Sequence, residues 1–150
     1  MVANRRESQH CPRSARIRPL QQTRPSNGLE EDPMSRPVHI CTIQPPAVGD
    51  DVSHEQMEDT ALRLLEEAGA CDADLVCLPE YLNVMGCADD AWRSPGPAEQ
   101  SPLFDKVAAL ARLHTMHVIL PVLDEREDGN FNTSLVIDRS GQVVGRYDKT

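Results

Sequence analysis

The sequence lacks the features that mark several large classes of protein. It has no hydrophobic run approaching the roughly 20 residues that span a bilayer, so we expect no membrane partner. No two cysteines show Cys-x-x-Cys spacing, the five histidines show no metal-ligand spacing, and nothing resembles a glycine-rich phosphate loop. We therefore expect no bound metal and no cofactor.

Basic residues are also scarce in most of the chain. The formal net charge of -9 divides into +3 for residues 1–37, where seven arginines face four acids, and -12 for residues 38–150. The second value comes from eight Lys and Arg against twenty Asp and Glu. Because nucleic-acid binding needs clustered Lys and Arg, we expect no nucleic-acid partner for the acidic part.

The first 33 residues differ in composition from the rest. They are rich in Arg, Pro, Ser, Gln and Asn with almost no apolar residues, so they cannot bury a core and are predicted to be disordered. An Arg-rich transit peptide is one interpretation, but the prolines and the lack of an apolar helical face count against it. We expect residues 1–33 to be an extension that precedes a natural start at Met34, and residues 34–150 to form one domain.

Two of the five cysteines, Cys41 and Cys77, lie inside apolar segments. They are predicted to be small, buried thiols. This usage of cysteine is typical of a reducing compartment, so we expect a cytoplasmic protein.

The apolar pattern from residue 38 predicts alternating strands and helices. The runs at 38–44, 75–78 and 117–124 predict strands, and the run at 75–78 is expected to be buried on both faces. A capping box at Ser53 predicts a helix that ends at Gly69, and Ser101 with Pro102 predicts a second helix. This order predicts parallel strands joined by right-handed crossovers.

The pattern changes after residue 124. Turn signals at 128–129 and 139–142 bound two strand-like segments, 131–138 and 143–148, which together predict a hairpin. The predicted fold class is therefore α/β, with a mixed sheet and helices on one face.

Glu80 is the first candidate for chemistry. Pro79 cannot continue a strand, so Glu80 stands at the carboxyl end of a predicted parallel strand, where open α/β sheets place ligand sites. A carboxylate held beside apolar side chains tends to have a raised pKa, which suits a general base near neutral pH. Taken alone, a glutamate in this position is more often a solvated loop residue.

Lys149 is the second candidate. Strand alternation places it on one face with Val143 and Tyr147. A lysine directed inward from that face can stabilise an oxyanion, whereas the alternative is a strand-end lysine that reaches water. Neither candidate is a nucleophile, and Cys87, the nearest thiol after Glu80, is not placed at a strand-to-helix turn.

With these residues the chain resembles the carbon–nitrogen hydrolases of the nitrilase superfamily. The similarity runs from about residue 38 to residue 150. It rests on the opening strand that ends in Gln44, the Leu78-Pro79-Glu80 block, the Asn132-Thr133-Ser134 segment and the block from Gly145 to Thr150. The order and wide separation of the Glu and Lys blocks are more specific than either block alone.

The resemblance implies the N-terminal half of a four-layer α-β-β-α sandwich that hydrolyses non-peptide carbon–nitrogen bonds. Residues 81–86 do not match the block that follows the glutamate in true nitrilases, so a small amide is favoured over a nitrile or carbamoyl compound. The resemblance also implies that Glu80 is the general base and that Lys149 stabilises the tetrahedral intermediate. The family's cysteine nucleophile follows the lysine block and here would fall beyond Thr150, so we expect this chain to be catalytically incomplete, with apolar sheet surface uncovered.

Two other interpretations stay open at this point. The chain can be a non-catalytic α/β module that keeps the fold for binding or assembly. It can also be an unrelated doubly wound binding domain, which predicts that Glu80 and Lys149 lie far apart. Because members of the family often form dimers, the resemblance also raises the possibility of a homo-oligomer.

Overall fold

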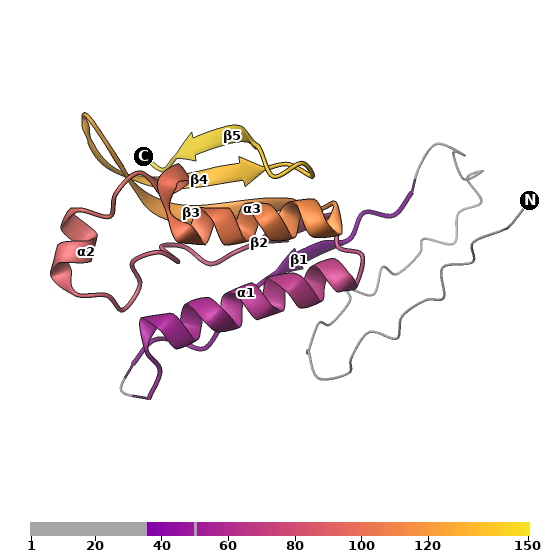
Figure 1. Ribbon diagram of the computed structural model, residues 1–150, viewed down its shortest axis with the longest axis horizontal. Helices are drawn as coiled ribbons and strands as arrows, with labels where there is room; N and C mark the ends of the chain where they lie inside the picture. Colours follow the sequence, from indigo (N-terminus) through magenta and orange to yellow (C-terminus); the bar gives the residue numbers. More distant parts are fainter. Residues whose placement is uncertain (1–35, 50) are drawn as a thin grey trace, which may run out of the picture.

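The computed structural model describes residues 36–49 and 51–150. The predicted N-terminal extension and the start at Met34 lie outside this part of the chain. The described residues form a five-stranded sheet in the order β1-β2-β3-β4-β5, and two long helices pack on it (Figure 1).

The elements follow the predicted order. They are β1 (Ile40–Thr42), α1 (His54–Ala70), β2 (Leu75–Cys77), α2 (Asp89–Arg93), a 3-10 helix (Ala98–Gln100), α3 (Pro102–His114), β3 (His117–Arg126), β4 (Gly129–Ile137) and β5 (Val143–Asp148). The connection at 82–100 contains two short helices that the sequence pattern did not predict. Within the described residues, no helix combines the length and the apolar character needed to cross a membrane.

Both long helices begin at the predicted caps. The Ser53 hydroxyl accepts a hydrogen bond from the Gln56 backbone N–H, and the Gln56 side chain accepts one from the Ser53 N–H at 2.9 Å, which completes the capping box. The Ser101 hydroxyl likewise accepts from a backbone N–H in the first turn of α3, with Pro102 at the first position of that helix. These bonds satisfy backbone donors that a helix start otherwise leaves open.

The prediction that Gly69 ends α1 is wrong. The helix continues to Ala70, and Gly69 is a buried helical residue. A Cβ atom on Gly69 would lie only 2.4 Å from Cγ of His114 at the end of α3. The glycine therefore permits the close approach of the two helices rather than a change of chain direction.

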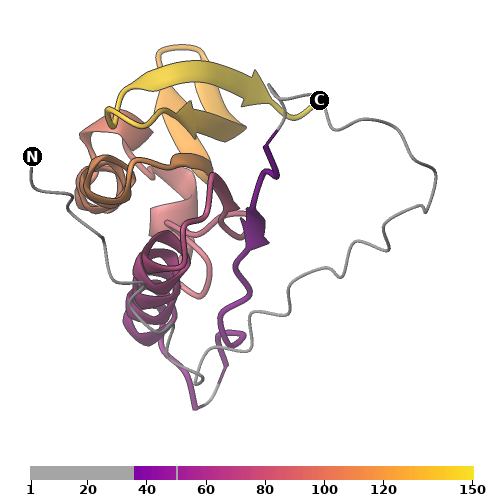
Figure 2. The ribbon, with the colours of Figure 1, turned by 90° about the vertical axis from the view of Figure 1, so that its right-hand side faces the viewer.

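The sheet is mixed, as predicted. β1 pairs with β2 and β2 with β3 in parallel, whereas β3–β4 and β4–β5 are antiparallel. The two helices lie on the same side of this sheet (Figure 2). Their buried side chains, among them Met57 and Val107, form one core with the sheet residues Val76, Val118 and Leu135.

The strand β2 is buried on one face only, which corrects the prediction that it is buried on both. Val76 points into the core and is 0% exposed, whereas Leu75 and Cys77 are only partly buried on the other face. The reason is that both long helices cover the same side. We call the opposite side the helix-free face, and it leaves Val38, Ile40 and Tyr147 exposed.

A bulge alters the predicted alternation of β5. The register shifts between Val136 and Ile137, so that Val143 pairs with Ile137 while Gly145 pairs with Val136. Val143 consequently packs against the core, and Tyr147 lies on the helix-free face. The prediction that Val143, Tyr147 and Lys149 share one face is therefore wrong for Val143.

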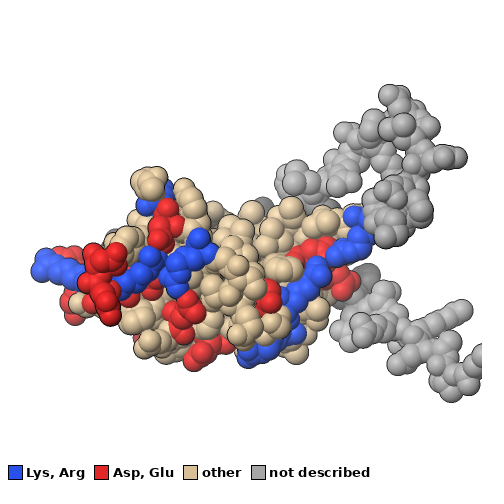
Figure 3. All heavy atoms as spheres, turned by 90° about the horizontal axis from the view of Figure 1, so that it is seen from above, with Lys and Arg blue, Asp and Glu red and all other residues tan. Residues whose placement is uncertain are grey.

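Charged side chains of both signs lie next to one another on the face seen from above in Figure 3. Several charged residues of the chain form ion pairs, such as those of Arg146 with Glu99 and of Arg126 with Asp148. These pairs neutralise individual charges locally, and the net acidic excess of the sequence remains.

Candidate active site

Glu80 and Lys149 meet at the carboxyl end of β2. Glu80 lies in the turn that follows β2, and Lys149 comes directly after β5. The Nζ atom of Lys149 donates a hydrogen bond to Oε1 of Glu80 at 2.7 Å, across a sequence separation of 69 residues. The unrelated binding domain, which predicts that these residues lie far apart, is therefore contradicted.

The hairpin places Lys149 at this position. The Lys149 backbone N–H donates to the Asn132 carbonyl at 2.9 Å, which continues the β4–β5 ladder one residue past the end of β5. β4 in turn pairs with β3, and β3 is the parallel neighbour of β2. The sheet thus brings the two distant sequence blocks to one edge.

The pKa of Glu80 is lowered, not raised as the sequence predicted. Hydrogen bonds from Lys149 and then Asn132 lower this pKa and outweigh the opposing effect of burial. The side chain is 47% exposed, so it is not enclosed by apolar walls. In the same contact, the hydrogen bond and charge of Glu80 raise the pKa of Lys149, so both groups are ionised at neutral pH.

Asn132 also belongs to this site, although the sequence indicated it only as part of a predicted strand and of a segment that carries the family resemblance. Its Nδ2 atom donates to Oε1 of Glu80 at 2.7 Å and to the hydroxyl of Tyr81 at 2.8 Å. A usable signal was present, because the predicted hairpin sets Asn132 opposite Lys149. Sequence alternation alone could not show that its amide reaches Glu80.

Two aromatic side chains border the site. The ring of Tyr81 packs on Trp92 of α2, with centroids 5.2 Å apart and ring planes at 55°. Trp92 comes from the long connection at 82–100, and no pattern in the sequence placed it near Glu80. This aromatic pair supplies an apolar surface next to the ion pair.

The residues that alternate with Asn132 and Lys149 form a separate polar network on the other side of the sheet. The side chains of Thr133 and Asp148 point to the opposite side of the sheet from those of Asn132 and Lys149. Both are hydrogen-bonded to Arg126. Arg126 also donates to the buried carboxylate of Asp124 at 2.9 Å, and Arg146 donates to the same carboxylate.

This network lowers the pKa values of both of its carboxyl groups. Hydrogen bonds from Arg126 and then Thr133 hold the pKa of Asp148 well below its usual range. Burial by itself would raise the pKa of Asp124, but bonds from the Ala98 backbone and from Arg126, with the charge of Arg146, lower it overall. The network is thus a set of ionised, mutually paired groups beneath the strand that leads to Lys149.

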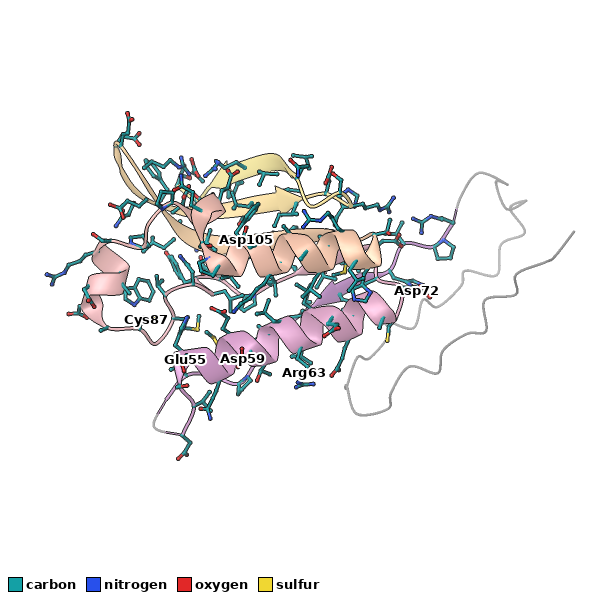
Figure 4. The ribbon with its side chains drawn as sticks, viewed as in Figure 1. Glu55, Asp59, Arg63, Asp72, Cys87 and Asp105 are labelled. Atoms are coloured by element: carbon teal, nitrogen blue, oxygen red, sulfur yellow. The ribbon has the colours of Figure 1, made fainter. Side chains whose placement is uncertain are left out.

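Three cysteines of the described chain are free thiols, and none of them is among the groups that shift the pKa values of Glu80 and Lys149. Cys87 sits near the start of α1 (Figure 4). Burial, followed by the charges of Glu58 and Asp90, raises the pKa of the Cys87 thiol, which disfavours the reactive thiolate. Cys41 packs against the core. Cys77 is the last residue of β2, three residues before Glu80, and its thiol is directed to the backbone carbonyl of Leu78.

The described residues also contain no group of three or more His, Cys, Asp or Glu side chains arranged to hold a metal ion. The chemistry available at this edge is therefore that of a carboxylate, an ammonium group, an amide and a phenol.

Residues 40–150 match the model of the carbon-nitrogen hydrolases. The chain belongs to the carbon-nitrogen hydrolase family. The match contains the Glu80 and Lys149 blocks and covers all nine helices and strands of the described residues.

Solved structures show the same fold in longer proteins. The carbon-nitrogen hydrolase from Helicobacter pylori G27 is 18% identical with a TM-score of 0.59, and the match covers 75% of this chain and 39% of that protein. The C. elegans NitFhit protein is 22% identical with a TM-score of 0.58, over 73% of this chain and 26% of that protein. An amidase from Nesterenkonia sp. AN1 is 18% identical with a TM-score of 0.58, over 75% of this chain and 44% of that protein.

This chain therefore spans less than half the length of these structures. At such identities the likeness establishes the fold, which is the incomplete nitrilase-type α/β arrangement that the sequence predicted. The mixed sheet with helices on one face is confirmed, and so is membership of the family.

Proposed function

We propose that Glu80 and Lys149 form the general base and the oxyanion-stabilising group of a site that hydrolyses the carbon–nitrogen bond of a small amide. The observation that carries the proposal is their 2.7 Å contact at the carboxyl end of β2, in a chain of the carbon-nitrogen hydrolase family. The third component is a cysteine thiol from outside the described residues. The Nesterenkonia amidase has an active site cysteine, to which acrylamide adds by Michael addition in a mutant, and this supports a thiol of that kind.

The proposed reaction proceeds in two halves. The Glu80 carboxylate takes the thiol proton as the sulfur attacks the amide carbon, and the ammonium of Lys149 stabilises the oxyanion that forms. Collapse of this intermediate breaks the carbon–nitrogen bond, with the proton returned from Glu80 to the leaving amine. Water, deprotonated by Glu80, then attacks the thioester and releases the acid and the thiol.

The lowered pKa of Glu80 fits this cycle when substrate binding is considered. Before substrate binds, the Lys149 hydrogen bond keeps Glu80 ionised and ready to accept a proton, but also makes it a weak base. A substrate carbonyl that takes over the Lys149 N–H weakens the hydrogen bond to Glu80. The carboxylate then becomes more basic at the moment when a proton must be moved.

A small amide is the substrate class that we favour. The aromatic surface of Tyr81 and Trp92 leaves an apolar wall next to two charged groups, which suits a short acyl chain with a polar carboxamide. In two mutants of the Nesterenkonia amidase, the active site cysteine carries acrylamide, joined by Michael addition, and the acetamide moiety of fluoroacetamide. Both are small amides.

The test is an ammonia-release assay on the longest polypeptide encoded in frame with this chain. We expect turnover of short aliphatic amides, and we expect Glu80→Gln to reduce kcat/KM about a thousandfold or more, because the substitution removes the base. The matched control is Glu66→Gln, the same substitution at an exposed position on α1.

Retained turnover in Glu80→Gln would contradict the role of Glu80. A protein that hydrolyses only nitriles or carbamoyl compounds would contradict the substrate class. Absence of any turnover in a folded protein that contains the downstream cysteine would favour the binding or assembly module instead.

A further inference from the structure

Asn132 is hydrogen-bonded to three other residues of the proposed site, Glu80, Tyr81 and Lys149. It lies on β4 with its side chain on the helix-free face, while Thr133 and Leu135 of the same strand are buried toward the helices. The two N–H groups of its amide have different acceptors, Oε1 of Glu80 at 2.7 Å and the hydroxyl oxygen of Tyr81 at 2.8 Å. Its backbone carbonyl accepts from the Lys149 N–H at 2.9 Å.

The side chain and the backbone of Asn132 contact different residues. The amide acts on the carboxylate and on the phenol, whereas the carbonyl holds the segment that carries Lys149. Substitution of the side chain therefore removes the contact to Glu80 and leaves the backbone bond to Lys149 in place. An ordinary strand asparagine would not be expected to connect two charged residues 69 positions apart.

Tyr81 gives a second reason to regard this arrangement as a constraint. Its φ angle is +58°, in the left-handed region that a tyrosine rarely adopts. Such a conformation persists only when surrounding contacts fix it, and here the hydroxyl is bonded to Asn132 while the ring packs on Trp92. Because Tyr81 directly follows Glu80, fixing the Tyr81 turn also fixes the direction of the Glu80 side chain.

We infer that Asn132 is a positioning residue that fixes the Glu80 carboxylate against Lys149 and keeps the Tyr81 turn in its strained conformation. The inference rests on the proposed function for its catalytic meaning. Its physical content, the control of the ionisation and orientation of Glu80, can be measured on the chain without any turnover.

The first experiment is a carbon-13 NMR titration of the Glu80 carboxyl in the 150-residue chain. Asn132→Ala removes the bond from the amide, so the pKa of Glu80 should rise. Asn132→Asp has nearly the same shape but places a second carboxylate beside Glu80, so the rise should be larger. Asn130→Ala is the matched control, because Asn130 lies on the same strand and donates two hydrogen bonds to the carbonyls of Trp92 and Arg93 rather than to Glu80.

The inference would be overturned if an Asn132 variant kept the native amide spectrum and the pKa of Glu80 did not change. So would an equal shift in Asn130→Ala. Tyr81→Phe keeps the bond between Asn132 and Glu80 but removes the second acceptor, so we expect a smaller rise than in Asn132→Ala. An equal or larger rise would show that Tyr81, not Asn132, controls the carboxylate.

The second experiment measures turnover in the extended, cysteine-containing protein. We expect Asn132→Ala to lower kcat about tenfold with KM changed less than about twofold, because the base is misdirected while the substrate still binds. Asn132→Ser, which keeps a hydroxyl donor, should lose less activity than Asn132→Ala. If the unsubstituted protein has no activity, the proposed function fails, but the titration still decides the role of Asn132.

Discussion

At the residue scale, the contact between Glu80 and Lys149 changes the ionisation of both partners. Each stabilises the charged form of the other, so the pKa of Glu80 is lowered and that of Lys149 is raised. Both side chains are about half exposed, at 47% and 60%, so solvent screens the attraction and the pair adds little to stability. Its effect is on orientation and proton transfer.

Replacement of Lys149 gives a direct prediction about Glu80. In Lys149→Met, the main hydrogen bond that lowers the pKa of Glu80 is lost, so we expect this pKa to rise toward its ordinary value. A carboxyl carbon-13 titration measures the shift. Lys106→Met is the control, because Lys106 makes a similar 2.9 Å ion pair with Glu58 on the helices, and it should leave the titration of Glu80 unchanged.

At the element scale, neighbouring residues along the β4–β5 hairpin point to opposite sides of the sheet and belong to two different polar clusters. One set of side chains, Asn132 and Lys149, reaches Glu80, while the residues next to them, Thr133 and Asp148, bind Arg126. Because the two sets alternate along the same strands, a change in the register of the hairpin would disrupt both. The Arg126 network therefore supports the strand geometry on which the candidate site depends.

Removal of Arg126 should destabilise the fold in a way that depends on pH. Arg126→Met leaves the buried carboxylate of Asp124 with fewer partners, and we expect a loss of about 2 kcal/mol in the free energy of unfolding at pH 7. Urea unfolding at several pH values measures it.

The pH dependence follows from the lowered pKa values of Asp124 and Asp148. A carboxylate with a lowered pKa stabilises the folded state above its ordinary pKa, and this contribution is lost as the pH falls through the folded-state value. The difference in the free energy of unfolding between the original protein and Arg126→Met should therefore be largest near neutral pH and decrease in acid. A difference that grows in acid would contradict the network.

The first helix offers a separate prediction. Ser53→Ala removes the hydroxyl that accepts from Gln56, so we expect a loss of about 1 kcal/mol in the free energy of unfolding. Ser94→Ala is the matched control, because Ser94 follows α2 and its side chain caps no helix start. Equal melting curves for the two variants would mean that the capping box does not stabilise α1.

Several elements could be predicted because their signals are local. The caps at Ser53 and Ser101 mark helix starts, and the apolar runs together with the turn at 139–142 define the strands and the hairpin. The positions of Glu80 and Lys149 follow from that order. The role of Asn132 and the bulge in the hairpin could not be predicted, because they depend on side-chain reach and ladder register across distant segments.

The direction of the Glu80 pKa shift was missed for a related reason. The sequence shows that the residues before Glu80 are apolar, which favours burial, but it does not show which charge the carboxylate meets. The contact with Lys149 and the exposure of the turn reverse the expected direction. The place of Gly69 within α1 was missed for the same kind of reason, because only its packing against His114 explains it.

At the scale of the whole molecule, the two faces of the sheet differ. Both long helices cover one face, and the helix-free face exposes Val38 and Ile40 at 56% and 63%. The four-layer sandwich that the family resemblance implies has a second sheet packed against this face. An apolar sheet surface of this kind favours association when it is open to water.

We therefore expect the 150-residue chain to bind the dye ANS and to self-associate. Ile40→Glu should reduce both, because it places a charge on the helix-free face. Leu113→Glu is the control, since Leu113 is similarly exposed, at 68%, but lies on α3. Sedimentation velocity that shows a stable monomer without dye binding would contradict this expectation.

The candidate site also depends on the whole molecule, because its charged pair comes from segments 69 residues apart and its proposed nucleophile from outside the described chain. Glu80 and Lys149 are proposed to act on the same substrate as one catalytic unit. Residues that act as a unit show strongly non-additive effects on turnover.

A double-mutant cycle in kcat/KM on the extended protein tests this claim most directly. The variants are Glu80→Gln, Lys149→Met and the two combined, assayed for ammonia release from a short aliphatic amide. We expect each single substitution to reduce kcat/KM about a thousandfold, and the double variant to be little worse than either. A shared site would be contradicted if the fold-reduction in kcat/KM of the double variant equalled the product of the two single reductions. Near-normal turnover in either single variant would contradict it as well.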